Sequence, residues 1–310
     1  MNEFDLIRLL TRDLPPNPTV VEGPGDDCAV LDLGAGADYT LFKTDAVVEG
    51  VHFAPDTPPE RIGHKALARN LSDFAAMSGK PTHAVVTLGL PPGFDPERPQ
   101  AIYRGMLELA SPLGVSIVGG ETTTCPERLF LSIAMIGRVE RERCVRRRGA
   151  QPGDALFVTG DLGGSLEGRH LEFMPRLAES RWLSKHWKLH SMIDLSDGLA
   201  GDLPHLLSPD QLGAELHSPS IPISRAAKRR ARSGGKSPLQ AALTDGEDFE
   251  LLFTLASRDA VPLRDAWQVP FPDVRLTCIG RIKETPGITI RDRTGGHTLT
   301  EHGYRHFEQP

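Results

Sequence analysis

Two adjacent aspartates follow a glycine–proline turn near the start of the chain. The segment 23–28 reads GPGDDC and leads into the apolar run Ala29–Leu31. Neighbouring carboxylates repel one another, so Asp26 and Asp27 form either a solvated surface turn or part of a cation site. Gly, Pro and Asp are the commonest turn formers, and this segment taken alone favours the turn.

Further carboxylates recur along the chain, mostly where an apolar segment stops. In α/β proteins ligands bind in the loops at strand ends, because the sheet fixes these loops in place. Carboxylates that converge there need divalent cations between them, and Mg²⁺ prefers such hard oxygen ligands and keeps phosphate oxygens in its remaining positions. The pattern therefore predicts a magnesium site that handles phosphate. The acidic residues in question are Asp26 with Asp27, Asp45, Asp73, Glu121, Asp194 with Asp197, and Glu247 with Asp248.

Two glycine pairs accompany these carboxylates. Gly119 and Gly120 precede Glu121, and the pair at 163–164 follows the segment TGD. Glycines lack a Cβ, so we expect both pairs to let the backbone approach a bulky anion. The chain has neither the GxxxxGK[ST] pattern of a P-loop nor a GxGxxG that leads from a strand into a helix. A nucleotide would therefore bind through another architecture.

The elements that must position these residues read as a mixed α/β fold. We expect strands at 39–45 with Asp45 at the exit, at 84–90 before a Pro-Pro break, at 115–118 before GGETTT, and at 129–139, 155–159 and 192–195. Segment 61–77 has helical period, with Leu67, Leu71 and Phe74 on the packing face and Asp73 on another. The charge-dense segment 140–154 predicts a boundary between two domains, 1–140 and 141–310.

Bulk properties narrow the class of protein. A chain of 310 residues with 39% apolar residues has enough core for about two domains. Its net charge of −6 gives no reason to expect nucleic acid as a partner. The four cysteines show no metal-ligand spacing and no disulfide framework. No signal peptide or membrane-spanning run is visible, so we expect a cytoplasmic protein without a membrane partner.

Taken in order, the motifs resemble one family. GPGDDCAVL, TDAVVEGVHF, KALARNLSDFAAM, GGETT, RRRGAQPGD, TGDLGGS, IDLSDGLAGDL, TDGEDFELLFT and GYRHF closely resemble the thiamine-monophosphate kinase family, and they span nearly the whole chain. The resemblance implies two α/β domains of the aminoimidazole-ribonucleotide-synthetase type and a homodimer paired through the N-terminal domains. It also implies ATP as co-substrate, several Mg²⁺ ions, and transfer of the γ-phosphoryl group to thiamine monophosphate to give thiamine diphosphate and ADP.

The resemblance also implies roles for single residues. No side chain acts as nucleophile or general base, because the acceptor phosphate is itself a nucleophile. Glu121 stands where the family has aspartate, which extends the carboxylate by one methylene, and Asp26 is expected beside the metal ligands. The implied magnesium ligands are Asp27, Thr44, Asp45, Asp73, Glu121, Asp194 and Asp197. The implied ATP contacts are Tyr103, Gly120, Glu121, Arg147 and Ser196, with Lys43 as a neighbour. The implied thiamine-phosphate contacts are His52, Glu247 and Tyr304.

Other functions remain open at the level of sequence. An aminoimidazole-ribonucleotide synthetase, a selenophosphate synthetase or a hydrogenase-maturation enzyme would share the handling of ATP and differ on the substrate side. The segments GEDFELLF and GYRHF favour the thiamine kinase, and the absence of a nucleophilic cysteine near the N-terminus disfavours selenophosphate synthesis. A nucleotide-binding scaffold without catalysis is the alternative from another class, and Glu121 is the one motif departure that supports it.

Overall fold

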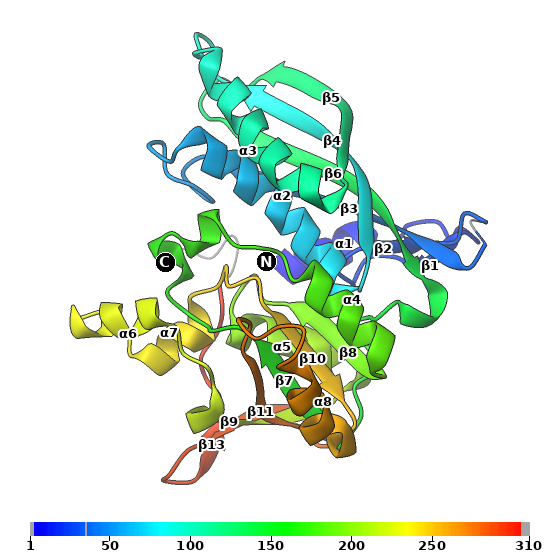
Figure 1. The fold of residues 1–310 in the computed structure, drawn as a ribbon, viewed down its shortest axis with the longest axis vertical. Coiled ribbons are helices and arrows are strands. Elements are labelled where there is room, and N and C mark those ends of the chain that lie inside the picture. Colours follow the sequence, from blue (N-terminus) through cyan, green and yellow to red (C-terminus); the bar gives the residue numbers. More distant parts are fainter. Residues whose placement is uncertain (1–2, 35, 305–310) are drawn as a thin grey trace.

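The chain folds into two sheets, one from each half of the sequence (Figure 1). The computed structural model describes residues 3–34 and 36–304. Helices and strands mix in both halves, which confirms the predicted α/β class. None of the described helices combines the length and the apolar character needed to span a bilayer. All four cysteines are free thiols.

The N-terminal sheet has six strands in the order β1-β2-β3-β6-β4-β5. Neighbours are antiparallel except for β4 and β5, which are parallel and need the helix α3 as their crossover. Helix α2 packs on β3, β4 and β6, and α3 packs on α2. The elements are α1 (Glu3–Thr11), β1 (Val20–Glu22), β2 (Ala29–Leu31), β3 (Asp38–Val48), α2 (Pro59–Ala76), β4 (Lys80–Leu90), α3 (Glu97–Leu113), β5 (Ser116–Thr124) and β6 (Phe130–Glu140).

The C-terminal sheet has seven strands in the order β13-β12-β9-β11-β7-β10-β8. The pair β12 and β9 is parallel, and the other pairs are antiparallel. Strand β8 lies at one edge and ends at Asp194. The elements are β7 (Ala155–Thr159), α4 (Leu177–His186), β8 (Leu189–Asp194), α5 (Leu199–Leu207), β9 (Gly213–His217), α6 (Arg225–Arg232), α7 (Pro238–Thr244), β10 (Leu251–Leu255), α8 (Ala260–Trp267), β11 (Leu276–Lys283), β12 (Gly287–Arg291) and β13 (Gly296–Thr298).

Helix α2 joins the two halves. The predicted packing face is confirmed, since Leu67, Leu71 and Phe74 have no exposed surface. The same hydrophobic core contains Met192 and Phe253 from the C-terminal sheet, because α2 also contacts β8 and α4. Figure 1 shows α2 in the middle of the molecule, between the sheets. A second core, formed only by residues of the C-terminal half, fills the other side of that sheet. Helix α2 is therefore placed to carry side chains into the space between the halves.

Two strand ends differ from the sequence prediction. Strand β3 does not stop at Asp45 but continues to Val48, because its pairing with β6 runs on to Phe130. Strand β5 includes GGETTT rather than ending before it. Its backbone pairs along β4 up to Thr124 opposite Leu90, and these backbone hydrogen bonds hold the segment extended whatever its side chains. The predicted strands at 84–90, 129–139 and 155–159 are confirmed, as is the break after Leu90.

Candidate active site

Three buried aspartates from distant parts of the chain meet between the two sheets. Asp27 precedes β2, Asp73 lies in the last turn of α2, and Asp194 ends β8. Each offers one carboxylate oxygen, and these oxygens all lie within 4.8 Å of one another. Their exposed fractions are 1%, 7% and 5%. We call these residues the carboxylate trio. The structure thus brings together three of the predicted metal ligands, whose role remains a prediction.

Among the residues that the structure describes, the cationic side chains paired with the acids of this region are fewer than those acids. Arg147 donates to Asp27 Oδ1 over 2.5 Å, and Lys43 Nζ lies 3.1 Å from Asp73 Oδ1. Asp26 adds a fourth carboxylate, which accepts the backbone N–H of Arg147. Four carboxylates therefore share two cationic side chains.

One carboxylate oxygen of the trio has no hydrogen-bond partner among the described residues. Asp27 Oδ2 is buried, and no described group of the protein hydrogen-bonds to it. A buried carboxylate oxygen without a partner is costly, so it marks a position where a positively charged ligand is expected. An all-oxygen donor set with excess negative charge fits a hard divalent cation such as Mg²⁺.

The protonation of the site reflects the same shortage of positive charge. Burial, followed by repulsion from Asp27, raises the pKa of Asp26 to about 7 and that of Asp194 to about 6. Burial also raises the pKa of Asp73 well above its usual range, although Lys43 opposes the shift. Burial alone would lower the pKa of Lys43, but the charges of Asp73 and Asp45 outweigh it and raise that pKa. Without a further cation, Asp26, Asp73 and Asp194 keep their protons to a higher pH than an ordinary aspartate does, and a bound divalent ion would replace those protons.

Thr44 and Asp45 lie on opposite faces of β3, because side chains alternate along a strand. Asp45 faces α2, where Arg69 donates to it over 2.7 Å. Thr44 is exposed on the other face, where its hydroxyl lies 3.4 Å from that of Ser132. The structure therefore does not place the Thr44 hydroxyl beside the trio.

Glu121 lies on the same open face as Thr44. The register that pairs Glu121 with Thr87, and Thr87 with Ser132, places all three on one face of the N-terminal sheet. The Glu121 side chain is exposed, and one carboxylate oxygen accepts the backbone N–H of Thr122. Within one chain Glu121 is thus separated from the trio by the sheet.

Asp197 and Ser196 lie in the loop that follows β8. The Asp197 backbone N–H donates to Asp202 Oδ2 over 2.9 Å, and the Ser196 carbonyl accepts the N–H of Glu247. Asp202 is buried in α5, and burial followed by the charges of Asp197 and Asp194 raises its pKa well above the usual range. Asp202 is not among the site residues predicted from the sequence, although it lies within the motif IDLSDGLAGDL.

Three of the four paired glycines pack closely against the backbone of the chain itself. A Cβ on Gly120 would lie 1.9 Å from the Val86 carbonyl oxygen, so this glycine permits the close approach of β5 to β4. A Cβ on Gly163 or Gly164 would meet the backbone of α7 or α6. The N–H groups of both residues donate to carboxylates of the chain itself, Asp248 for Gly163 and Asp245 for Gly164. The expectation of an anion cradle at 163–164 is therefore wrong, because packing and internal hydrogen bonds already occupy it.

The predicted substrate side is divided between the halves. His52 follows β3, and its Nδ1 accepts the backbone N–H of Val48. Burial and then the charges of Arg69 and Lys65 lower the pKa of His52 to about 4, so its ring is neutral near pH 7. Tyr304 is half exposed, and its backbone N–H donates to the Asp197 carbonyl. Residues 305–307 of the motif GYRHF lie outside the described residues.

Glu247 is tied to two cations that the sequence analysis missed. Its Oε2 accepts from Lys65 Nζ over 2.7 Å, and its Oε1 lies 3.6 Å from Arg69 Nη1. Lys65 and Arg69 belong to α2 and precede Asp73 at intervals of four residues. That helical spacing is the signal in the sequence that could have identified them.

A second group of buried acids is neutralised by the protein itself. Glu250 accepts hydrogen bonds from Arg176 at 2.7 and 2.8 Å and from Arg169 at 3.0 Å. Asp248 accepts from Arg169 at 2.7 Å and from the Gly163 N–H at 2.9 Å. We call these four side chains the arginine-paired cluster. Two arginines of the basic segment 169–177, RHLEFMPRL, thus pair with acids of GEDFELLF.

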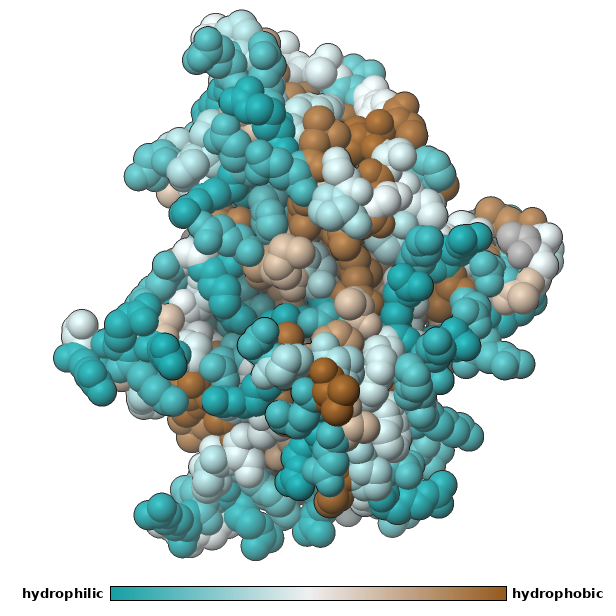
Figure 2. Space-filling model, in the orientation of Figure 1, coloured by the Kyte–Doolittle hydropathy of each residue, from teal (hydrophilic) through white to brown (hydrophobic). Residues whose placement is uncertain are grey.

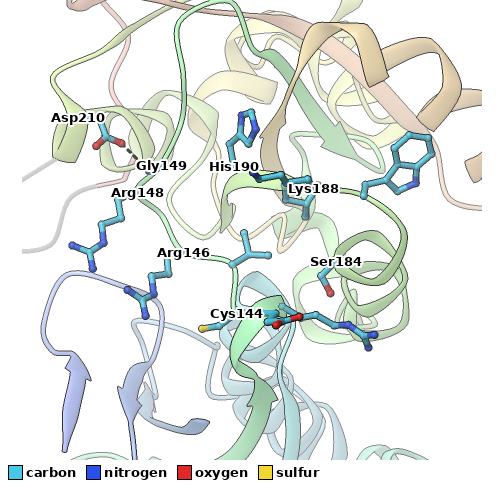
Figure 3. A pocket seen from close by; sticks show the side chains of 13 residues that line it. Cys144, Arg146, Arg148, Gly149, Ser184, Lys188, His190 and Asp210 are labelled. Atoms are coloured by element: carbon cyan, nitrogen blue, oxygen red, sulfur yellow. Dashed lines mark hydrogen bonds between the residues drawn. The ribbon is translucent and has the colours of Figure 1, made fainter. Parts of the chain in front are cut away.

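A cavity of about 430 Å³ lies beside the segment that joins the halves (Figure 3). Arg146 and Arg148 both pair with Glu22, whereas Arg147 between them turns to Asp27. The cavity lining also includes Arg143, which pairs with Glu140, and contains no member of the trio. These internal ion pairs account for most of its positive charge.

Tyr103 and Arg147 are the remaining two of the predicted ATP contacts. Tyr103 lies on α3 and is partly buried against the N-terminal core. Arg147 contacts the trio through Asp27. The structure places Arg147, and not Tyr103, in direct contact with the trio.

Known proteins resemble this chain in sequence and in fold. Residues 25–139 match the family model described as AIR synthase related protein, N-terminal domain. The thiamine-monophosphate kinase of Rhodopirellula baltica is 40% identical over 296 residues, which cover 93% of this chain and 90% of that protein. The thiamine-monophosphate kinase of Escherichia coli K12 is 33% identical over 331 residues, which cover 99% of each. A solved structure described as AaThiL complexed with AMPPCP and TMP matches with a TM-score of 0.84 at 30% identity, covering 99% of this chain and 97% of that one.

Proposed function

The chain belongs to the thiamine-monophosphate kinase family, and from that premise we propose how its residues perform the reaction. The enzyme transfers the γ-phosphoryl group of ATP to the phosphate of thiamine monophosphate and releases ADP and thiamine diphosphate. An oxygen of the acceptor phosphate attacks the γ-phosphorus, and the bond from that phosphorus to the bridging oxygen of ADP breaks. The acceptor is already anionic, so we assign no side chain as nucleophile or general base.

The carboxylate trio holds magnesium in this proposal. Asp27, Asp73 and Asp194 supply the ligands, and Asp45 and Asp197 are the further candidates nearest in the fold. When bound, Mg²⁺ neutralises phosphate oxygens and helps to align the two anions. The observation that carries the proposal is the buried, unpartnered Asp27 Oδ2 within a trio whose oxygens lie within 4.8 Å.

Arg147 and the loop after β8 serve the nucleotide. The Arg147 guanidinium now donates to Asp27, and a cation on Asp27 would free its N–H groups to bind phosphate oxygens. Ser196 lies two residues after Asp194, so a phosphate held by the trio is within reach of that loop. Tyr103, Gly120 and Glu121 remain ATP contacts by family resemblance.

His52, Glu247 and Tyr304 form the thiamine-phosphate side in this proposal. Thiamine carries a cationic heterocycle, which suits a carboxylate and an aromatic ring. The neutral ring of His52 adds no repulsion toward that cation. The magnesium side and the thiamine side are then linked by α2, which contributes Asp73 to one and contacts Glu247 at the other.

A second copy of the chain covers the open face of the N-terminal sheet in this proposal. Phe42, Val85, Val118 and Ile136 are each at least 41% exposed, and the strand register places Phe42, Val85 and Ile136 on this face. Figure 2 shows hydrophobic side chains gathered at the upper right, beside β4–β6 of Figure 1. Pairing would also give the exposed Thr44 and Glu121 a partner surface. Sedimentation of wild type and Ile136→Asp tests this, and an active wild-type monomer at assay concentration would contradict it.

In this proposal the predicted domains, 1–140 and 141–310, contribute different parts of the site. Residues 1–140 contribute Asp27, Asp73 and the pairing face, and residues 141–310 contribute Asp194 and Glu247. The cytoplasmic location expected from the sequence stays a prediction.

An ADP-release assay with product analysis tests the function. Wild type with ATP and Mg²⁺ should convert thiamine monophosphate to the diphosphate and should leave free thiamine unchanged, because only the monophosphate presents a phosphate oxygen. Aminoimidazole ribonucleotide precursors serve as the control for related enzymes. Diphosphate formed directly from free thiamine would contradict the assignment.

A further inference from the structure

Lys65 is a fully buried lysine that none of the predicted roles includes. Its exposed fraction is 0%, although it lies in the middle of α2. Its ammonium donates to the His52 carbonyl over 2.5 Å and to Glu247 Oε2 over 2.7 Å. A buried charge persists only where the geometry of its partners is good. Both partners belong to the proposed thiamine side, one from each half of the chain.

Lys65 begins a row of charges along one face of α2. Residues 65, 69 and 73 follow at intervals of four and therefore lie above one another. Arg69 reaches both Glu247 and Asp45, and Asp73 pairs with Lys43. Ion pairs thus link Glu247 to Lys65 and Arg69, Arg69 to Asp45, and Lys43 to Asp73 of the carboxylate trio. The row fixes the distance between the thiamine side and the metal side through a single rigid helix.

The loop that carries Glu247 has a backbone that would not hold its shape alone. Glu247 and Phe249 have φ values of +52° and +50°, a left-handed conformation that residues with a Cβ rarely adopt. The Glu247 N–H donates to the Ser196 carbonyl, and its carbonyl accepts from the Ser165 hydroxyl. The backbone is thus fixed from the C-terminal half, whereas the carboxylate is fixed from the N-terminal half by Lys65. Strain held in this way is typical of functional positions.

We propose that Lys65 is a positioning residue that sets the Glu247 carboxylate and the His52 main chain in register with the carboxylate trio. This inference rests on the proposed function. Lys65 does not touch the reacting phosphates in this account. Its removal should therefore weaken recognition of thiamine monophosphate and leave recognition of ATP nearly unchanged.

Steady-state kinetics of Lys65→Met provides the test. The variant keeps an unbranched side chain that is only one atom shorter, and it loses the charge and the donors. We expect the KM for thiamine monophosphate to rise about tenfold or more, because a charged hydrogen-bond partner of Glu247 is lost, and the KM for ATP to stay within about twofold. Arg61→Met is the matched control, since Arg61 lies one turn earlier on α2 and its pair with Glu172 is about half exposed rather than buried. Neither KM should change in that control.

A double variant separates positioning from general stabilisation. In a Glu247→Gln background, Lys65→Met should raise the KM for thiamine monophosphate much less than in wild type, because the charge that it positions is already gone. If Lys65→Met does not fold, as judged by thermal unfolding, Lys65→Gln replaces it under the same criteria. An unchanged KM for thiamine monophosphate, or an equal rise in both KM values, would overturn the inference. A wild type inactive on thiamine monophosphate would instead overturn the proposed function.

Discussion

The protein buries two groups of carboxylates and treats them in opposite ways. In the arginine-paired cluster, each oxygen of Glu250 accepts at least two hydrogen bonds, and the donors include Arg169, Arg176 and Thr159. In the carboxylate trio, Asp27 Oδ2 accepts none from the described residues. Burial is nearly the same, since Glu250 and Asp27 are both 1% exposed. The supply of cationic side chains, and not burial, therefore distinguishes the two groups.

The largest expected effect follows from removing a charge of the trio. Asp194→Asn should lower turnover on the order of a hundredfold or more, because a hard ligand to a phosphate-neutralising ion is lost. Its stability without magnesium should be equal to or higher than that of wild type, because a repelled buried carboxylate becomes neutral. Turnover and the thermal midpoint of the same preparation measure both effects. A destabilised variant with normal turnover would show that Asp194 stabilises the fold and does not serve catalysis.

The equivalent substitution in the arginine-paired cluster should lower stability and leave turnover nearly unchanged. Glu250→Gln removes the carboxylate that Arg169 and Arg176 share, so that Arg169 keeps only Asp248 and Arg176 keeps only Glu179. Breaking such a buried pair costs about 3 kcal/mol. The thermal midpoint should fall by several degrees. At a temperature where the variant is folded, turnover should stay within about threefold of wild type, since the four side chains of the cluster are paired with one another. A hundredfold loss of turnover without loss of stability would place the cluster in the catalytic machinery.

Magnesium alone should distinguish the two groups by a smaller effect. Ligands that bind only the folded state raise its stability, so Mg²⁺ without nucleotide should raise the thermal midpoint of wild type by a few degrees at saturating concentration. Asp194→Asn should lose most of this increase, whereas Glu250→Gln should retain it. Equal increases in all three proteins would show that magnesium binds elsewhere.

The smallest expected effect is a pH dependence in the arginine-paired cluster. Burial raises the pKa of Asp248 to about 7, although Arg169 and the Gly163 N–H oppose the shift and Glu250 adds to it. The folded protein then binds a proton that the unfolded chain has released, so stability is lost as pH rises from about 4 to about 7. The thermal midpoint of wild type minus that of Asp248→Asn should fall by a few degrees over this range and stay level above pH 8. A difference that rises with pH would contradict this.

The sequence indicated the carboxylate trio because its signals are local. GPGDDC, NLSDF and IDLSD each place an aspartate beside apolar residues, and Asp27, Asp73 and Asp194 do converge in the fold. The two faces of β3 could also be predicted from the sequence. Side chains alternate along a strand, so Thr44 and Asp45 point to opposite faces. The lengths of the strands were harder to predict from the sequence. Pairing with β6 extends β3, and pairing with β4 extends β5, past residues that are common in loops.

Long-range pairing accounts for most of what the sequence did not indicate. Arg176 and Glu250 are 74 residues apart, and Lys65 and Glu247 are 182 apart. No local pattern predicts that the arginines of RHLEFMPRL will pair with the acids of GEDFELLF. Nor does one predict that a lysine within an amphipathic helix will be buried. The glycines at 163 and 164 were misread for the same reason, because their neighbours in space are α6 and α7.

Anomalous diffraction from crystals grown with Mn²⁺ and a non-hydrolysable ATP analogue tests the central claim most directly. Manganese replaces magnesium at oxygen ligands and gives an anomalous signal that locates it without assumptions about the density. The account predicts a peak in coordinating contact with Asp27, Asp73 and Asp194, with the formerly unpartnered Asp27 Oδ2 among the ligands, and no peak at the arginine-paired cluster. Ordered nucleotide phosphates with no manganese at the trio, and a water or an added side-chain donor on Asp27 Oδ2 instead, would contradict it.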